Sequence, residues 1–184
     1  MSTVVIIGGG PAGLSAALFT AKNGLETTVF DTDETAMHYA HLFNYLGIRS
    51  IDGEAFLEIG REQVDEYGAV RRSEAVTGVD SSDDGFVVHT DEDKYDAEYV
   101  VFATGQAREI VSELGCERND DGTVETDRNG RTSVNRVYAA GWLSRKDKVQ
   151  AAISVGDGAA AALDILSAER GKPYHDFDTP DDAE

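Results

Sequence analysis

The hydrophobic pattern at the start of the chain predicts a strand–helix–strand unit. Residues 3–7 form a continuous apolar, β-branched run, which is typical of a strand buried on both faces of a parallel sheet. Residues 14–23 contain helix formers with apolar residues at helical spacing, and Gly24 is expected to cap that helix. A second apolar run, residues 25–30, ends at Asp31. This order predicts a right-handed βαβ unit.

The middle of the chain contains shorter periodic segments. Residues 33–50 are irregular, whereas residues 53–67 have helical spacing and stop at Gly68. Residues 69–79 and 86–90 are expected to be strands separated by a polar turn at 81–85, and residues 97–103 another buried strand. These strands predict an antiparallel β-meander placed between the parallel strands.

The last third of the chain predicts one short strand and one long helix. Residues 109–132 are polar and rich in turn residues, and residues 137–140 form a short buried run. We expect a helix over residues 148–170, with Asp147 and Gln150 as an acidic variant of the capping box and Gly171 after its end. The whole pattern predicts an α/β fold with a parallel central sheet. It forms a single domain over residues 1–175, whose halves 1–110 and 132–175 are joined by a short loop at 111–131, and an acidic tail at 176–184.

Composition narrows the classes of function. The 184 residues carry 16 Lys plus Arg against 35 Asp plus Glu, a net charge of −19, which argues against binding nucleic acid or anionic membrane surfaces. There is no apolar run of about eighteen residues and no basic N-terminal region, so we expect a cytoplasmic protein without a membrane span. The single cysteine, Cys116, excludes an intramolecular disulfide and an intrachain dithiol pair.

The kind of acidity adds a hypothesis about habitat. Asp exceeds Glu, Lys is scarce, and the acid is spread along the whole chain. This surface is typical of a salt-loaded cytoplasm such as that of haloarchaea, where the Debye length falls to about 3 Å at roughly 1 M salt. The alternative is an ordinary acidic protein from a mesophile.

The glycine-rich loop after the first strand carries the candidate chemistry. In a G-x-G-x-x-G pattern, Gly8 makes the tight turn, Gly10 lets the backbone approach a pyrophosphate, and Gly13 permits close contact between helix and strand. The helix N-terminus after Pro11 supplies oriented N–H groups. Asp31 is placed to accept hydrogen bonds from ribose hydroxyls, although an acid could also stand there by chance, since 35 of 184 residues are acidic. Together these residues predict dinucleotide binding.

Several later segments, in order, resemble one family. Residues 43–47, the Ala103-Thr104-Gly105 triplet, residues 137–141 and residues 149–152 are similar to segments of the FAD-binding half of thioredoxin reductases and other pyridine nucleotide–disulfide oxidoreductases. The resemblance implies a Rossmann-like FAD-binding domain with FAD as cofactor. It assigns no catalytic residue. The cofactor-binding residues that loop and resemblance indicate are Gly8, Gly10, Pro11, Ala12, Gly13, Asp31, Asn44, Ala103, Thr104, Gly105, Gly141, Trp142, Gln150 and Ala151.

The chain also departs from that family. It has no second glycine fingerprint and no C-x-x-C pair, so the NADPH-binding domain of the family is missing and dithiol exchange with thioredoxin is excluded. Trp142 stands where the family has Asp, and Asp157 is a candidate to compensate. His38 and His41 lack a third ligand, so no metal site is expected.

Two classes of function follow. The leading interpretation is a minimal FAD-binding flavoprotein that passes electrons between NAD(P)H, or a redox partner protein, and an unknown acceptor. The alternative is a non-catalytic nucleotide-binding module or a subunit of a larger complex. Because loss of a covering domain exposes apolar surface, we expect a homodimer or a partner chain.

Overall fold

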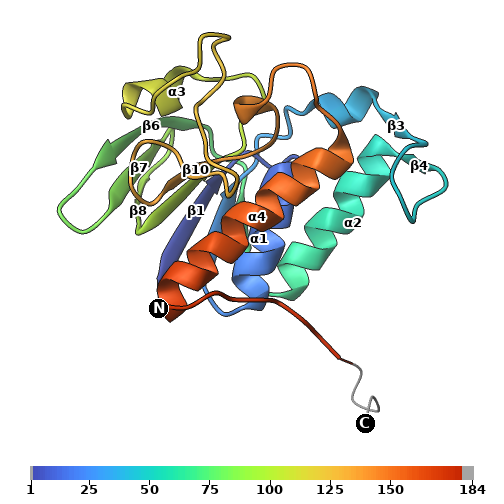
Figure 1. The fold of residues 1–184 in the computed structure, drawn as a ribbon, viewed down its shortest axis with the longest axis horizontal. Coiled ribbons are helices and arrows are strands. Elements are labelled where there is room, and N and C mark those ends of the chain that lie inside the picture. Colours follow the sequence, from blue (N-terminus) through green and yellow to red (C-terminus); the bar gives the residue numbers. More distant parts are fainter. Residues whose placement is uncertain (1, 180–184) are drawn as a thin grey trace.

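The computed structural model describes residues 2–179 and is built on a five-stranded parallel sheet (Figure 1). The strand order is β10-β9-β1-β2-β5, so the strands that follow β1 first extend the sheet on one side and then return to its other side. The strands of this sheet are β1 (Thr3–Ile7), β2 (Glu26–Phe30), β5 (Val70–Arg72), β9 (Tyr99–Phe102) and β10 (Val137–Ala139).

Both faces of the sheet are covered. One face carries the helices α1 (Pro11–Lys22), α2 (Gly53–Glu66) and α4 (Ala151–Arg170) (Figure 1). The other face packs against α3 (Glu109–Glu113) and an antiparallel sheet of β6 (Val76–Ser81), β7 (Phe86–Thr90) and β8 (Lys94–Ala97). The expected βαβ unit, parallel sheet and antiparallel excursion are therefore confirmed.

Burial on both faces explains the continuous apolar runs of the central strands. In β1, Val4 and Ile6 pack with the helices, whereas Val5 and Ile7 pack with the antiparallel sheet. All four side chains are at most 5% exposed. A strand of this kind has no solvent face, and so its sequence does not alternate between apolar and polar residues.

Helices α1 and α4 lie side by side and approach each other unusually closely (Figure 1). A Cβ atom placed on Gly158 of α4 would lie 2.0 Å from the carbonyl oxygen of Ala12 in α1. The Ser15 hydroxyl of α1 also donates a hydrogen bond of 2.8 Å to the carbonyl oxygen of Val155. The small residues of α4 therefore bring the N-termini of both helices to the same end of the sheet.

Two predicted strands were wrong, because each is divided between the two sheets. The run 69–79 is divided between β5 and β6, because residues up to Arg72 pair with β2 and those from Val76 pair with β7. The run 97–103 is likewise divided, since Ala97 ends β8 and Tyr99 begins β9 in the other sheet. Strand β8 itself was not predicted.

The expected start of the last helix was also wrong. Helix α4 begins at Ala151, with Gln150 as its N-cap, and among residues 2–179 no side chain hydrogen-bonds to cap that end. The proposed capping role of Asp147 is therefore not found. The end is confirmed, because Gly171 adopts φ +63°, the left-handed conformation of a helix C-cap.

Short elements and loops complete the fold. The segment 111–131, expected to be a joining loop, starts inside α3 and includes a bridge between Arg118 and Val124. In the tail, Asp176 and Asp178 pair with Lys22, while residues 180–184 lie outside the described part. The remaining elements are the 3₁₀ turns η1 (Ala36–Tyr39) and η2 (Gly141–Ser144) and the strands β3 (His41–Leu42) and β4 (Ile51–Asp52).

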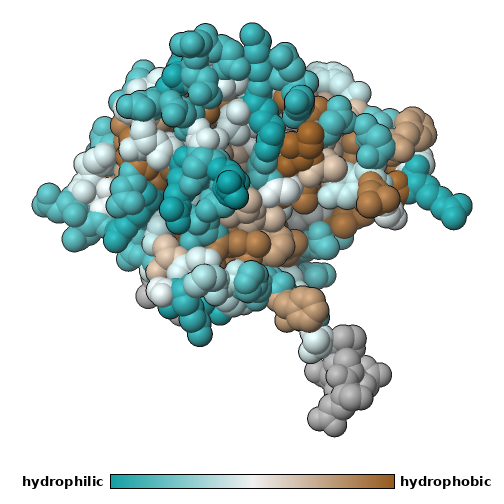
Figure 2. All heavy atoms as spheres, viewed as in Figure 1, coloured by the Kyte–Doolittle hydropathy of each residue, from teal (hydrophilic) through white to brown (hydrophobic). Residues whose placement is uncertain are grey.

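The surface is mostly polar, with one prominent apolar end. Figure 2 shows apolar side chains at the end of the molecule where Figure 1 places β3 and β4. Tyr39, Phe43 and Leu46 in this region are 95%, 74% and 99% exposed. Helix α4 is long and apolar enough to cross a membrane by length and composition alone, and in this fold it packs against α1.

Candidate functional site

A cleft of about 780 Å³ opens at the carboxyl ends of the parallel strands. It is lined by the residues that follow β1, β2, β9 and β10, together with η1 and the start of α4. This is the place where the strand order changes direction, between β1 and β9. Open α/β sheets bind ligands at such a switch point, and the volume is in the range of ligand pockets, about 300–1,000 Å³.

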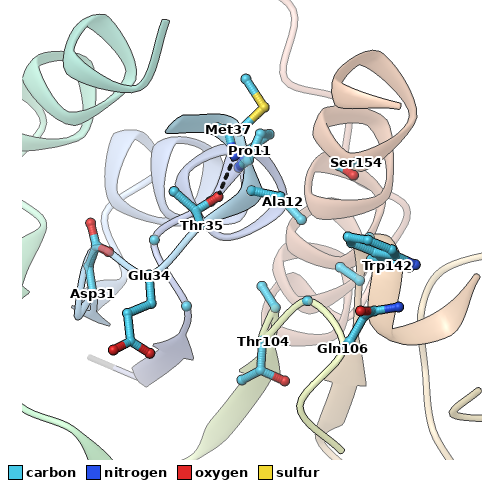
Figure 3. Close-up of a pocket in the computed structure, with 18 of the residues that line it drawn as sticks. Pro11, Ala12, Asp31, Glu34, Thr35, Met37, Thr104, Gln106, Trp142 and Ser154 are labelled. Atoms are coloured by element: carbon cyan, nitrogen blue, oxygen red, sulfur yellow. Dashed lines mark hydrogen bonds between the residues drawn. The ribbon is translucent and has the colours of Figure 1, made fainter. Parts of the chain in front are cut away.

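The glycine loop forms the floor of the cleft, and its close contacts leave no space for a side chain at several of its positions. Gly8 has φ +112°, and a Cβ on it would lie 2.3 Å from the carbonyl oxygen of Ala103. A Cβ on Gly13 would lie 1.8 Å from the carbonyl oxygen of Gly8, so α1 packs directly on the loop. Gly10 is the N-cap of α1, and Pro11 and Ala12 line the cleft at the helix start (Figure 3). The first N–H groups of α1 therefore face the cleft as anion donors.

Asp31 closes one side of the cleft. Its side chain is 8% exposed and stacks over Gly9, where a Cβ would lie 2.0 Å from the carboxyl carbon. The carboxylate accepts a hydrogen bond of 2.9 Å from the Asp33 N–H and forms an ion pair of 2.9 Å with Arg61. In Figure 3 it lies on the opposite side of the loop from Trp142. The position is the expected one for an acid at the end of β2.

The opposite wall comes from the segments after β9 and β10. Thr104 and Gly105 form a turn in which the Thr104 hydroxyl donates 2.6 Å to the Ala107 carbonyl and Gly105 has φ +61°. Gly141 has φ +71°, and a Cβ on it would lie 3.1 Å from the Cβ of Ala12. The half-buried Trp142 lines the cleft beside Gln106 (Figure 3). Asp157, the candidate to replace the missing acid, is instead paired with Arg145 at 2.6 Å and is not among the residues that line the cleft.

An amide pair joins two walls across the mouth of the cleft. The Asn44 side chain, in the loop between β3 and β4, donates a hydrogen bond of 2.7 Å to the Oε1 atom of Gln150. Gln150 is the N-cap of α4, and Ala151 and Ser154 follow it along the cleft. Residues 106 positions apart in the chain thus meet beside the N-terminus of a second helix.

Ion pairs and hydrogen bonds set the charges around the cleft. Arg61 holds the pKa of the Asp33 carboxyl below its usual range, and the carbonyl and carboxylate of Asp33 raise the pKa of His38. Glu74 also lines the cleft, and the hydroxyl of Tyr95, which donates to it at 2.7 Å, lowers the pKa of the Glu74 carboxyl. The lowered pKa values keep the carboxyl groups of Glu74, which lines the cleft, and Asp33, which does not, ionised at neutral pH.

The structure brings together all the proposed site residues except Gly13, which lies behind the loop. Sequence reasoning missed other residues of the lining. Thr35 alone has a local signal, since it is the N-cap of η1 and its hydroxyl accepts a hydrogen bond of 3.3 Å from the Met37 N–H. Met37 lies in η1, which has no helical or strand periodicity, and the others stand in loops or in the first turn of a helix, outside any motif. The missed residues include Glu34, Thr35, Met37, Glu74, Gln106, Ile110 and Ser154. Within residues 2–179, no group of three or more His, Cys, Asp or Glu gathers as a metal site.

The residues present fit a dinucleotide with a flavin ring. The glycine cradle leaves no room for side chains at Gly8 and Gly9, the N-termini of α1 and α4 both reach the cleft, and an acid stands at the end of β2. This combination defines a dinucleotide-binding α/β domain. Gly10 and Pro11 would hold the pyrophosphate, and Asn44 and Gln150, which also line the cleft, would hold the ring.

Comparison with known proteins identifies the family. The profile of the family "Pyridine nucleotide-disulphide oxidoreductase" matches residues 2–107 and 69–156. The chain belongs to this family of oxidoreductases.

The curated relatives are longer than this chain. A thioredoxin reductase of Spironucleus barkhanus is 30% identical over 93% of this chain and 54% of its own length. A dihydrolipoyl dehydrogenase of Halobacterium salinarum is 30% identical over 86% of this chain and 35% of its own length. The chain therefore spans about half, or less, of these two relatives.

Solved structures agree on the fold. A thioredoxin reductase from Gloeobacter violaceus superposes with a TM-score of 0.86 at 21% identity, covering 97% of this chain and 98% of the other. The atypical thioredoxin reductase of Desulfovibrio vulgaris Hildenborough gives 0.83 at 22% identity, covering 95% and 100%. The expected thioredoxin reductase-like FAD-domain fold is thus confirmed.

Proposed function

We propose that this chain is a flavoprotein that holds one FAD in the cleft and passes electrons between NAD(P)H, or a redox partner protein, and an acceptor. Bound FAD would supply reversible two-electron chemistry, which no side chain of this protein supplies. The observation that carries the proposal is the cleft itself. Four segments far apart in the sequence place a glycine cradle, an acid and two helix N-termini around one volume of about 780 Å³.

The roles of the chain's own residues follow from their positions. The first turn of α1 would neutralise the pyrophosphate, which matters in a chain with a net charge of −19. The N-terminus of α4, beside Gln150 and Ala151, would favour negative charge on the nearest edge of the ring. Cys116 is the one cysteine in the sequence, so the proposed electron transfer does not use dithiol exchange.

The test is uptake of FAD by the purified protein. We expect a yellow protein, or a colourless one that takes up added FAD with quenching of Trp142, the single tryptophan, which lines the cleft. Anaerobic titration with NADH and NADPH then decides the donor, because bleaching by dithionite alone would indicate a protein donor. A protein that takes up no FAD would refute the assignment.

A pair of variants separates cofactor binding from folding. A Cβ on Gly10 would meet only the Thr35 hydroxyl, at 3.5 Å, so Gly10→Glu leaves the fold intact and puts a carboxylate where the pyrophosphate would lie. Gly156→Glu adds the same charge to the exposed side of α4. We expect Gly10→Glu to abolish FAD uptake with little change in melting temperature, and Gly156→Glu to retain it.

The exposed apolar residues support a second part of the proposal, a homodimer. Tyr39, Phe43 and Leu46 form one exposed group beside the mouth of the cleft, and such groups mark interaction sites. We expect light scattering to report a dimer, and Leu46→Asp to shift it toward monomer. Phe177→Asp, at an 84% exposed residue of the tail, is the control. A monomeric wild-type protein at high concentration would contradict the dimer.

A further inference from the structure

Asp31 is held from behind by charged side chains that do not line the cleft. Arg61 of α2 reaches the Oδ2 atom of Asp31 through Nε at 3.1 Å and through Nη2 at 2.9 Å. The same guanidinium pairs with Asp33, whose Oδ1 atom lies 2.9 Å from the Nε2 atom of His38. Arg61, Asp33 and His38 are not among the lining residues. They therefore act on the cleft through Asp31.

This arrangement leaves the Asp31 carboxylate little freedom. A carboxylate offers about four lone-pair sites, and three are used here, one by the Asp33 N–H and two by Arg61. Gly9 lies directly beneath the carboxyl group, so it cannot move toward the loop without a clash. One acceptor site remains on Oδ1, the oxygen that Arg61 does not occupy.

Burial distinguishes this ion pair from the others on α2. The side chains of Arg61 and Asp31 are 19% and 8% exposed, whereas those of Arg71 and Asp65 are 32% and 47% exposed. Arg61 stands on the buried face of α2 between Leu57 and Val64, where an apolar side chain would satisfy packing. Exposed ion pairs contribute little to stability. A largely buried guanidinium that hydrogen-bonds to a ligand-binding carboxylate instead fixes the orientation of that carboxylate.

We propose that Arg61 is a positioning residue for the adenosine half of the cofactor, because it fixes the Asp31 carboxylate with one free acceptor site turned to a ribose hydroxyl. The inference rests on the proposed function, since it requires an adenine dinucleotide in the cleft. Without Arg61, Asp31 would face Asp33 without the guanidinium that pairs with both carboxylates, and binding would have to bring the Asp31 carboxylate back into place.

The test compares ligands that do and do not contain the adenosine ribose. Dissociation constants for FAD, ADP and FMN are measured by isothermal titration calorimetry, which does not depend on the absorption of the ligand. We expect Arg61→Met to weaken FAD and ADP about tenfold, the scale of one charge-assisted hydrogen bond. FMN, which lacks that ribose, should change less than about twofold. Arg61→Lys should recover part of the loss. Arg71→Met removes the same charge from an exposed pair, and because Arg71 interacts with Asp31 only weakly, all three dissociation constants should change less than about twofold.

A double-mutant cycle with Asp31→Asn identifies the route of the effect. If Arg61 acts through Asp31, Arg61→Met should have little further effect in the Asp31→Asn background. A tenfold loss that persists in that background, an equal loss for FMN, or unchanged or tighter FAD binding by Arg61→Met would each overturn the inference. If the wild-type protein binds neither FAD nor ADP, the proposed function fails and the inference fails with it.

Discussion

Replacing Gly158 by Ala tests how the α1–α4 contact supports the cleft. The added Cβ would lie 2.0 Å from the carbonyl oxygen of Ala12 and 3.0 Å from the backbone nitrogen of Ala16. Both are backbone atoms of α1 and cannot rotate away, so α4 must move. Two positions earlier, Gly156 is exposed, and a Cβ on it would meet no atom within 4 Å among residues 2–179. Gly156→Ala is therefore a control in the same helix with the same change in composition.

The two variants should shift stability in opposite directions. Each gains about 0.8–1 kcal/mol of helix propensity, because glycine is a poor residue inside a helix. In Gly158→Ala this gain is exceeded by overpacking, which costs about 1–3 kcal/mol in most cores, and the clash with backbone places this site at the upper end. We expect Gly156→Ala to be about 1 kcal/mol more stable than wild type and Gly158→Ala about 2 kcal/mol less stable. For a chain of this size these values correspond to about +3 °C and −6 °C in melting temperature.

Denaturation followed by Trp142 fluorescence, at constant salt, measures both variants. Displacement of α4 should also move Gln150 away from Asn44, so Gly158→Ala should bind FAD more weakly while Gly156→Ala binds it as the wild type does. If Gly158→Ala gains the same stability as Gly156→Ala, the close approach of the two helices is not rigid. The explanation of the small-residue stretch in α4 would then be wrong.

Three further predictions concern charge and burial. Melting temperature should fall when salt is lowered from roughly 1 M to 0.1 M, because the Debye length grows to about 10 Å and the net charge of −19 repels itself; an unchanged value would refute the salt-adapted surface. Burial raises the pKa of the Cys116 thiol, so a disulfide reagent at pH 8 should modify it far more slowly in the folded than in the unfolded protein. The neutral thiol then stabilises the fold fully below the unfolded pKa of about 8.5, and that stability is lost as pH rises through the folded value. Asp164→Ala should cost about 2–3 kcal/mol in urea denaturation, because the buried carboxylate accepts hydrogen bonds from Arg131, Asn129 and Tyr138; a loss below about 0.5 kcal/mol would contradict this.

The part of the fold that the sequence predicts is the part fixed by local pattern. Residues 3–31 contain a two-face-buried strand, a glycine loop and a helix, each with its own signal, and they form the expected unit. The sheet to which a strand residue belongs is not determined by its local sequence. Ala97 and Tyr99 stand in one apolar run, and only their pairing with β7 and β1 assigns them to different sheets.

The same distinction applies to the site. Gly8, Thr104 and Gly141 could be placed from sequence because each stands in a short motif at a strand end, and the strand ends of a parallel sheet meet. Arg61 could not, because its role depends on a contact between α2 and Asp31, a residue 30 positions earlier in the chain. The family resemblance placed Asn44 and Gln150 at one site, but their direct contact depends on the loop between β3 and β4 reaching the start of α4, which neither segment indicates by itself.

The cleft does not depend on the connection between β9 and β10 beyond residue 110. In the described part of the chain, residues 111–136 contribute nothing to its lining. They instead form hydrogen bonds within the segment, such as Glu125 N–H to the Glu117 carbonyl at 2.9 Å. They also bond to neighbouring elements, such as Val124 N–H to the Leu143 carbonyl at 3.1 Å. The walls come from strand ends and from the α1–α4 contact, which are set by the sheet and the core. A connection of very different length could therefore join the same two strands and leave the cleft unchanged.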